Sequence, residues 1–101
     1  MAYRGYYRYN GQKYNSSFIV KSASKEHSLY AEGEDDGGKF SLDVTWEKSG
    51  LLQANKQYFG AHNVRWFGRV ELVKGKVERM LGVWELKDVT TGDFEYFLNS
   101  V

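Results

Sequence analysis

The sequence predicts an all-β fold, a single-domain antiparallel up-and-down meander barrel of about eight strands. Three observations support this prediction. Apolar and polar residues alternate strictly from Lys39 to Trp46, which is typical of a strand with one buried face. Turn signals rich in glycine, asparagine and aspartate recur at intervals of roughly 8 to 12 residues. The connectors at these signals are short, so segments that follow one another are expected to pair antiparallel.

The composition restricts the class of protein. The chain has 101 residues, of which 17% are aromatic and 27% charged, and it contains neither cysteine nor proline. This length suits one domain, residues 1–101, and the aromatic content is too high for a disordered chain. Without cysteine there is no disulfide framework, and no apolar run approaches the roughly 20 residues of a spanning helix. The polar, tyrosine-rich start does not resemble a signal peptide, so we expect a cytoplasmic protein.

Breaks at the turn signals divide the chain into eight expected strands. These are Tyr3–Tyr9, Gln12–Lys21, Ser28–Glu34, Lys39–Trp46, Leu51–Tyr58, Asn63–Val73, Lys76–Leu86 and Phe94–Leu98. The first two form a hairpin around Asn10-Gly11, because a type I′ turn needs positive φ at both central residues. Four later turns are expected from similar residues, at Asp35-Asp36-Gly37-Gly38, Lys48-Ser49-Gly50, Lys74-Gly75 and Thr90-Thr91-Gly92.

The segment that follows Ser49 fits two interpretations. Ser49 can cap a short helix that ends at Gly60 and that has one apolar face, made of Leu51, Leu52, Tyr58 and Phe59. The same segment also fits a two-residue period through Leu52, Ala54 and Tyr58, and it lies between two clear strands. We favour the strand.

Two late segments have apolar residues on both faces. In the first, Val64, Trp66, Val70 and Leu72 oppose Phe67 and Val73, and in the second, Met80, Trp84 and Leu86 oppose Val77, Leu81 and Val83. Strands that are covered on both sides have this pattern. The outer face of a single-layer barrel should be wet, so we expect a partner protein or a homodimer to cover Phe67, Val73, Leu81 and Val83.

An eight-stranded meander exposes two sheet edges unless its first and last strands pair, and closure into a barrel removes both. A barrel of this size is either filled by its own side chains or holds one small ligand. The candidate lining consists of Trp46, Tyr58, Trp66 and Trp84, with Arg65 as a polar group that would orient the ligand. Arg79 and Lys56 are alternatives for that polar group, and each of these three cations is expected to point outward. A filled core is the alternative for the same residues.

A resemblance to known families rests on the stretch from Gly33 to Trp84. It contains Gly33-Glu34-Asp35-Asp36, Gly38-Lys39-Phe40, Lys56-Gln57-Tyr58-Phe59-Gly60-Ala61-His62, Val64-Arg65-Trp66-Phe67-Gly68 and Gly82-Val83-Trp84. This pattern of turns and aromatic residues resembles small calycin-like meander domains and, more faintly, the avidin family. The resemblance covers about half of the chain, and it implies a closed antiparallel barrel with a central cavity.

The avidin resemblance departs from that family's pattern at the biotin-binding positions. The family has a ligand-binding asparagine and serine in an early strand, whereas Asn15 and Ser16 or Ser17 lie in the second segment here. Its late aspartate has only Asp93 as a counterpart. These departures speak against biotin as the ligand.

Polar clusters suggest no catalytic or metal chemistry. The acidic run of Glu32, Glu34, Asp35 and Asp36 could supply oxygen ligands to calcium, but it lacks the spacing of a calcium loop, and we interpret it as a solvated turn. His27 and His62 lie at strand ends without a nucleophile motif or a paired zinc spacing. We therefore expect no catalytic residues, no metal and no cofactor, and nothing argues for an enzyme.

The amino-terminal segments favour an alternative function. Basic and aromatic residues alternate there, namely Arg4, Arg8, Lys13, Lys21 and Lys25 with Tyr3, Tyr6, Tyr7, Tyr9 and Tyr14. Such surfaces can stack single-stranded bases and neutralise phosphates. The net charge of +1 weakens this interpretation, because it provides no global attraction to nucleic acid.

The leading hypothesis is a non-catalytic module that binds a small apolar ligand or a partner protein. The alternatives are nucleic-acid binding and a structural role in an assembly.

Overall fold

A computed structural model describes residues 1–24, 26–87 and 90–99, which contain eight strands and turns between them. The strands are β1 (Ala2–Tyr9), β2 (Gln12–Ser24), β3 (Ser28–Asp35), β4 (Gly38–Trp46), β5 (Leu51–Tyr58), β6 (Asn63–Val73), β7 (Lys76–Leu86) and β8 (Thr90–Asn99). Within these described ranges, no helix has the length and apolar character that a membrane crossing needs.

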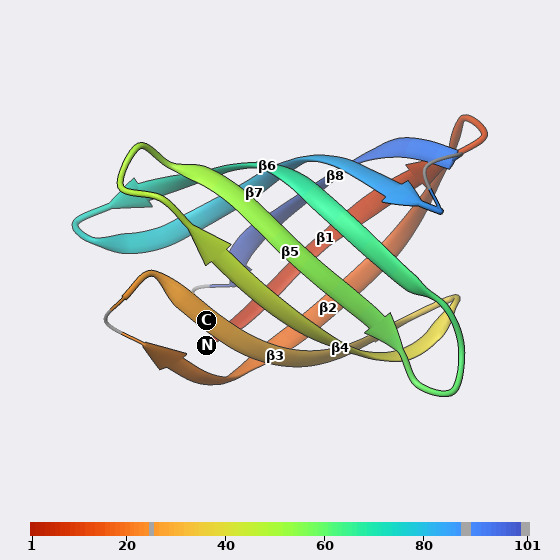
Figure 1. The fold of residues 1–101 in the computed structure, drawn as a ribbon, viewed down its shortest axis with the longest axis horizontal. Coiled ribbons are helices and arrows are strands. Elements are labelled where there is room, and N and C mark those ends of the chain that lie inside the picture. Colours follow the sequence, from red (N-terminus) through yellow and green to blue (C-terminus); the bar gives the residue numbers. More distant parts are fainter. Residues whose placement is uncertain (25, 88–89, 100–101) are drawn as a thin grey trace.

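The eight strands form a closed antiparallel barrel in which each strand pairs with the next (Figure 1). β1 and β8 close it, with Tyr3 opposite Leu98 and Tyr7 opposite Phe94. No edge strand remains, because the last pairing satisfies both free edges of the meander. The all-β class and the closed eight-stranded meander expected from the sequence are confirmed.

The tight turns have the backbone geometry that their residues predict. Asn10 and Gly11 have φ values of 51° and 77°, and Lys74 and Gly75 have 53° and 78°. Positive φ at both positions is the mark of a type I′ turn, whose twist matches that of the flanking strands. These two hairpins therefore fix the registers of β1 with β2 and of β6 with β7.

The segment after Ser49 is a strand, β5, so of the two interpretations the strand is the one that the structure contains.

The prediction of a turn at Thr90-Thr91-Gly92 is wrong, because these residues begin β8 and pair with β7. Gly92 lies opposite Trp84, and a Cβ on it would come within 2.6 Å of the indole Nε1. The glycine is therefore needed for packing against the tryptophan.

A register shift in β7 changes the face expected for Val77. Glu71 pairs with Arg79 but Leu72 pairs with Val77, so Glu78 is an extra residue in β7. Because a bulge reverses the alternation beyond it, Val77 points into the core and is 7% exposed, although the sequence pattern places it on the outer face. Leu72, which is opposite Val77 near the end of β6, is 46% exposed.

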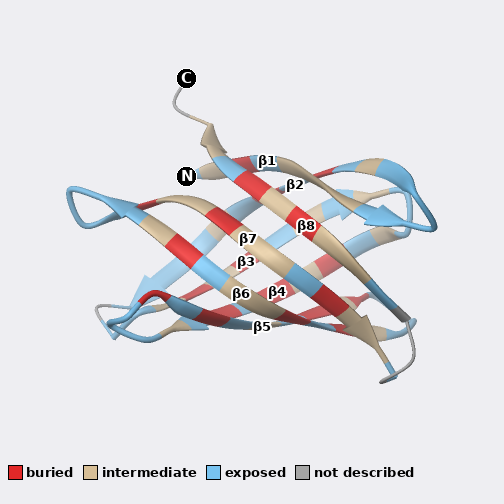
Figure 2. Cartoon of the chain, turned by 90° about the horizontal axis from the view of Figure 1, so that it is seen from above, coloured by how far each residue is buried: buried red, intermediate tan, exposed pale blue. Residues whose placement is uncertain are grey.

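The core lies inside the barrel and extends to the end where β1 begins and β8 ends. Its members alternate along the strands with exposed residues, as the red and pale blue bands of Figure 2 show. The side chains buried most completely are Tyr3, Phe18, Phe40, Leu42, Val44, Leu52, Met80, Phe94 and Tyr96.

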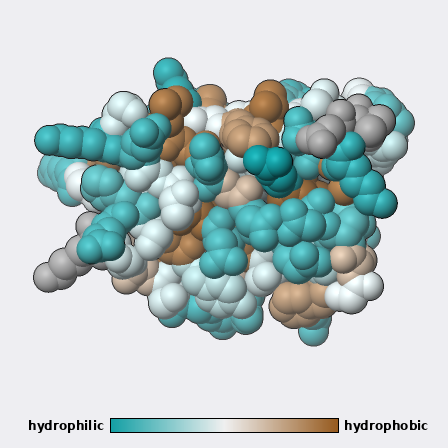
Figure 3. All heavy atoms as spheres, in the orientation of Figure 1, coloured by the Kyte–Doolittle hydropathy of each residue, from teal (hydrophilic) through white to brown (hydrophobic). Residues whose placement is uncertain are grey.

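The outer surface is predominantly hydrophilic on the face shown in Figure 3, with scattered apolar residues between the polar ones. On the outer side of β6 and β7, Phe67 pairs with Val83, and Leu81 lies two residues away along β7. Val83 is 49% exposed, while Phe67 and Leu81 are partly covered. The apolar outer residues expected from the sequence therefore do lie on one face.

We expect Gly82→Ala to destabilise the barrel. Gly82 pairs with Gly68, and an added Cβ would lie 2.2 Å from the Phe67 carbonyl oxygen and 2.6 Å from the Gly68 Cα. Backbone atoms cannot yield as a flexible side chain does, so the loss in unfolding free energy should reach about 2 kcal/mol or more. Chemical denaturation measures it, with exposed Gln53→Ala as the control that stays near the parent. Equal stability of the two variants would contradict the close approach.

Candidate functional site

A cavity of about 260 Å³ lies at the end of the barrel opposite the filled core. It is surrounded by the β1–β2, β3–β4 and β5–β6 turns, the end of β7 and the start of β8, which lie together on the right of Figure 1. Its lining consists of Tyr7, Tyr9, Gly37, Lys56, Tyr58, His62, Val64, Trp66, Trp84 and Leu86. We call this space the mouth cavity.

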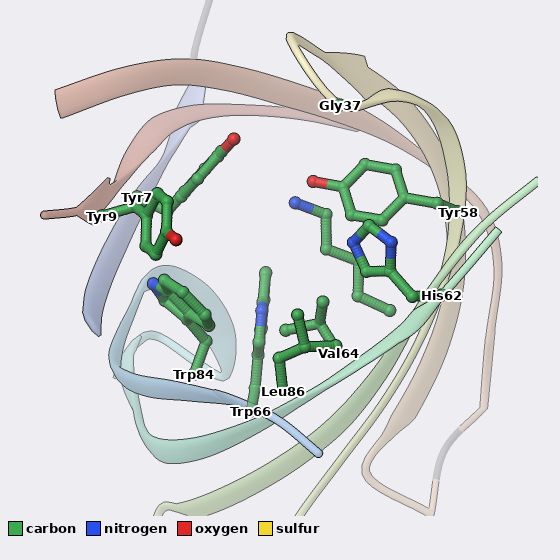
Figure 4. Close-up of a pocket in the computed structure, with 10 residues that line it drawn as sticks. Tyr7, Tyr9, Gly37, Tyr58, His62, Val64, Trp66, Trp84 and Leu86 are labelled. Atoms are coloured by element: carbon green, nitrogen blue, oxygen red, sulfur yellow. The ribbon is translucent and has the colours of Figure 1, made fainter. Parts of the chain in front are cut away.

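Aromatic rings form most of the walls of the mouth cavity. Tyr7 and Tyr9 face Trp84 from β1, and Tyr58 lies across the space from them (Figure 4). The Tyr7 and Trp84 rings meet edge to face with centroids 6.2 Å apart. Trp66 stacks on Phe94 at 4.1 Å, which ties the cavity floor to the core. These contacts hold the walls in place without filling the space between them.

A backbone hydrogen bond orients the Trp84 indole. Its Nε1 donates to the Arg8 carbonyl oxygen at 2.9 Å. A buried indole N–H normally needs such a partner, and this one fixes the ring plane against β1. The apolar face of Trp84 is therefore available to the cavity while its polar atom is satisfied.

A buried ion pair lies at one side of the mouth cavity. The Lys56 ammonium contacts the Asp35 carboxylate at 2.6 Å, and the two side chains are 4% and 0% exposed. Lys56 comes from β5 and Asp35 from the end of β3, two strands away. Desolvating both charges is expensive, so the pair is stable only because further groups satisfy each partner.

Hydrogen-bond donors surround the Asp35 carboxylate. The Tyr58 hydroxyl donates to both of its oxygens, at 2.9 and 3.1 Å, and the Ser16 hydroxyl donates at 3.1 Å. The Gly37 backbone N–H adds a bond of 2.9 Å from the β3–β4 turn. With Lys56, these donors come from β2, β5 and the turn, and they hold the charge in a fixed place.

Three aromatic faces surround the Lys56 ammonium. Its Nζ lies 4.4 to 4.9 Å from the ring centroids of Phe40, Tyr58 and Tyr7. Cation–π attraction at such distances partly replaces lost water. Burial lowers the pKa of Lys56 below its ordinary value, and the Asp35 charge opposes that shift without cancelling it.

Tyr7 and Tyr58 stay protonated well beyond their ordinary range. Burial is the largest cause that raises the pKa of each; Asp35 raises both pKa values further, and Asp36 raises that of Tyr7. The Tyr7 hydroxyl donates to the Asp36 carboxylate at the rim. Both hydroxyls therefore act as neutral hydrogen-bond donors, and neither is an activated phenolate.

The β5–β6 loop forms one rim of the cavity. The Gln57 side-chain amide donates to the carbonyl oxygens of Tyr58 and Ala61, each at 2.9 Å. His62 packs its ring on Tyr58 with centroids 4.9 Å apart and is exposed at the entrance. The loop is thus tied to its own strand, and His62 lies at the entrance of the mouth cavity.

The structure brings together three of the five predicted lining residues. Tyr58, Trp66 and Trp84 line the mouth cavity. Trp46 lies at the opposite end of the barrel, where its ring stacks on His27 at 5.8 Å. Arg65 is exposed on the outer face of β6, with its guanidinium 5.1 Å from the Phe67 ring.

The sequence predicts only part of the charged side of the site. Its acidic run suggests a solvated turn, which is wrong for Asp35. Lys56 lines the cavity as one of the candidate polar groups, but the outward direction expected for its side chain is wrong. The signal was present in the alternation, because Leu52, Ala54, Lys56 and Tyr58 share one strand face. A buried lysine needs a carboxylate partner, because an unpaired charge inside the barrel is costly. Asp35, on the inward face of β3, is that partner.

The other candidate sites are dispersed. Asn15 is exposed, Ser16 is buried against Asp35, and Asp93 pairs with Arg8 at the surface, so the avidin-like positions do not meet. Among the residues that the structure describes, no group of acidic and histidine side chains could hold a metal ion.

The basic and aromatic amino-terminal residues are divided between the inside and the outside of the barrel. Tyr3 is in the core and Tyr7 faces the cavity, so neither ring is presented on the outside. Tyr6 has its ring covered by Arg8 and Lys13, at 5.0 and 4.4 Å. Lys25, the last basic residue of that run, lies outside the described residues.

We expect Lys56→Met to destabilise the protein by about 3 to 5 kcal/mol, because it leaves the Asp35 charge buried without its cation. Adding Asp35→Asn should recover a large part of that loss. Chemical denaturation of both single variants, the double variant and the parent gives the coupling free energy, which we expect to be about 2 kcal/mol or more. Additive losses would contradict the ion pair.

Comparison with known proteins is consistent with this architecture. No protein-family model matches the chain, and neither does any curated protein. It is similar to a solved structure described as a redesigned β-barrel, with 13% identity and a TM-score of 0.67 over 99% of this chain and 90% of that one. At this identity the likeness shows the fold alone, a small antiparallel barrel of eight strands.

Proposed function

We propose that the protein is a non-catalytic binding module of calycin-like type that holds a small, flat, mostly apolar ligand in the mouth cavity. The observation that carries this proposal is the aromatic cavity at one end of the barrel. Aromatic walls surround about 260 Å³ of free space there, above a core of buried apolar side chains. Concave, mostly apolar sites with a few polar groups are typical of ligand pockets.

The walls suggest the shape of the ligand. Trp84 and Tyr58 face each other across the cavity, with Tyr7 and Tyr9 beside them (Figure 4). Planar rings gain most from such surroundings, because they can stack on one wall and meet another edge to face. The volume suits a ligand of one or two rings.

The polar groups suggest the chemistry of the ligand. Lys56 lines the cavity and has three N–H donors, of which one is directed to Asp35. Tyr58 uses its only hydroxyl proton on the same carboxylate. A ligand oxygen that accepts a hydrogen bond from Lys56 therefore fits this side, whereas a second cation does not.

Titration with 2-naphthylmethanol, followed by tryptophan fluorescence, tests the proposal. We expect saturable quenching, because Trp66 and Trp84 line the cavity. Leu86→Trp fills the cavity and should raise the Kd at least about tenfold, which corresponds to a loss of about 1.4 kcal/mol in binding free energy. Trp46→Phe is the matched control and should leave the affinity unchanged, since Trp46 is at the other end.

Two results would overturn the ligand site. One is an unchanged affinity in Leu86→Trp, which would place the probe elsewhere. The other is no saturable binding by the parent, which would mean that the cavity does not accept a planar ligand.

We also propose that a second copy of the chain covers the outer face of β6 and β7. Phe67 and Val83 are cross-strand neighbours there, and Leu81 adjoins them. Val83 and Val73 are 49% and 52% exposed, which leaves apolar surface in water. Such patches usually mark interaction sites, and two-fold dimers are the commonest form of self-association.

Sedimentation equilibrium tests the dimer. We expect a concentration-dependent dimer for the parent and a monomer for Val83→Lys, since a charge at the centre of an apolar contact is costly to desolvate. Ile19→Lys, exposed on β2 away from this face, is the control that should still dimerise. A parent that remains monomeric at high micromolar concentration would contradict the proposal.

A further inference from the structure

Lys56 differs from the other lysines of the protein. Every other lysine within the described ranges is exposed, whereas Lys56 is buried and lines the mouth cavity. Its amino group is therefore the one described lysine amine that a molecule seated in the cavity would meet. Binding alone does not require an amine at this position, because a neutral donor would suffice.

Burial favours the neutral amine of Lys56, because it removes the water that would solvate the ammonium and so lowers the pKa of Lys56. The same amine lines an open cavity, where it can meet a molecule seated there. Lysines desolvated in apolar pockets are the ones that attack carbonyl carbons, since only the unprotonated amine is nucleophilic. Asp35, at 2.6 Å from Nζ, is positioned to take the proton.

We propose that Lys56 binds a small aromatic aldehyde covalently, through a reversible imine between its Nζ and the carbonyl carbon of a ligand in the mouth cavity. The inference rests on the proposed ligand site and assigns a chemical class to its ligand. It follows from the placement of Lys56, Asp35 and the aromatic walls around one space.

The reaction balances with the groups present. Asp35 accepts a proton from the Lys56 ammonium, and the freed amine adds to the carbonyl carbon to give a carbinolamine. Loss of the former carbonyl oxygen as water, with protons from nitrogen and Asp35, leaves an iminium that carries one positive charge. The sum is ammonium plus aldehyde giving iminium plus water, with no net proton and no oxidant or reductant.

The buried charges are the same before and after the reaction. The iminium replaces the ammonium beside the Asp35 carboxylate, which keeps its bonds from Tyr58, Ser16 and Gly37. No uncompensated charge arises in the desolvated site, which would otherwise oppose the product. The cation–π contacts of the ammonium also suit a cationic iminium.

Incubation with 2-naphthaldehyde and sodium cyanoborohydride tests the inference, because reduction converts the imine into a stable secondary amine. Intact mass and peptide mapping should show one dominant adduct, on Lys56. The Lys56→Met/Asp35→Asn variant, which avoids an unpaired buried charge, should lose that adduct and retain only surface labelling. Lys39→Met, which removes an exposed lysine of β4, should leave the Lys56 adduct unchanged.

A parallel arm with 2-naphthylmethanol separates this inference from the proposed function, because that molecule has the same rings and no carbonyl. Excess 2-naphthylmethanol should suppress the Lys56 adduct by competition. Saturable binding of the alcohol without preferential labelling of Lys56 would overturn the imine and leave the ligand site standing. Failure of both probes to bind would overturn both, and labelling spread evenly over exposed lysines would also overturn the imine.

Discussion

The buried contact between Lys56 and Asp35 is the interaction on which the rest of the structure depends. Its two charges lie inside a barrel that is otherwise lined by apolar and aromatic side chains. Because strand side chains alternate, a slip of one residue in β3 or β5 would move one charge outside and leave the other unpaired. The pair therefore specifies the registers of β3, β4 and β5 together, and Ser16 and Gly37 extend that constraint to β2 and the β3–β4 turn. Its cost in desolvation is offset only when every one of these donors is in place.

The barrel is divided into a packed half and an open half by where bulky and small inward residues lie. Glycines such as Gly68 and Gly82 let the backbones of β6 and β7 approach closely, which a Cβ at either position would prevent. Toward the mouth, Trp66 stacks on Phe94 and Trp84 is held by the Arg8 carbonyl, so the large rings line the walls and leave the centre free. Tyr96 lies between the two halves, and its ring stacks on Trp66. Its hydroxyl is buried and has no hydrogen-bond partner among the described residues.

Local patterns were enough to predict the fold, because strand period and turn chemistry are short-range properties. The alternation in β4 and the Asn10-Gly11 turn each correspond to what the structure contains. The bulge at Glu78 could not be predicted, since an extra residue shows only when the partner strand is known.

For the site, the residue type of Tyr58, Trp66 and Trp84 was enough to predict that they line the cavity. Trp46 was wrongly placed with them, because alternation does not tell one end of a barrel from the other. Asp35 was missed and Lys56 was expected to point outward because charged residues usually face solvent, although the period of their strands places both inside.

The proposed ligand site requires an open mouth cavity and a buried ion pair that persists when a ligand is present. A crystal structure of the protein with 2-naphthylmethanol measures both at once. We expect a naphthalene ring between Tyr58 and Trp84, its hydroxyl directed to Lys56, and the Lys56–Asp35 contact retained. A cavity closed by the side chains of Trp84 or Tyr9, or Lys56 turned out to solvent with Asp35 alone inside, would contradict it.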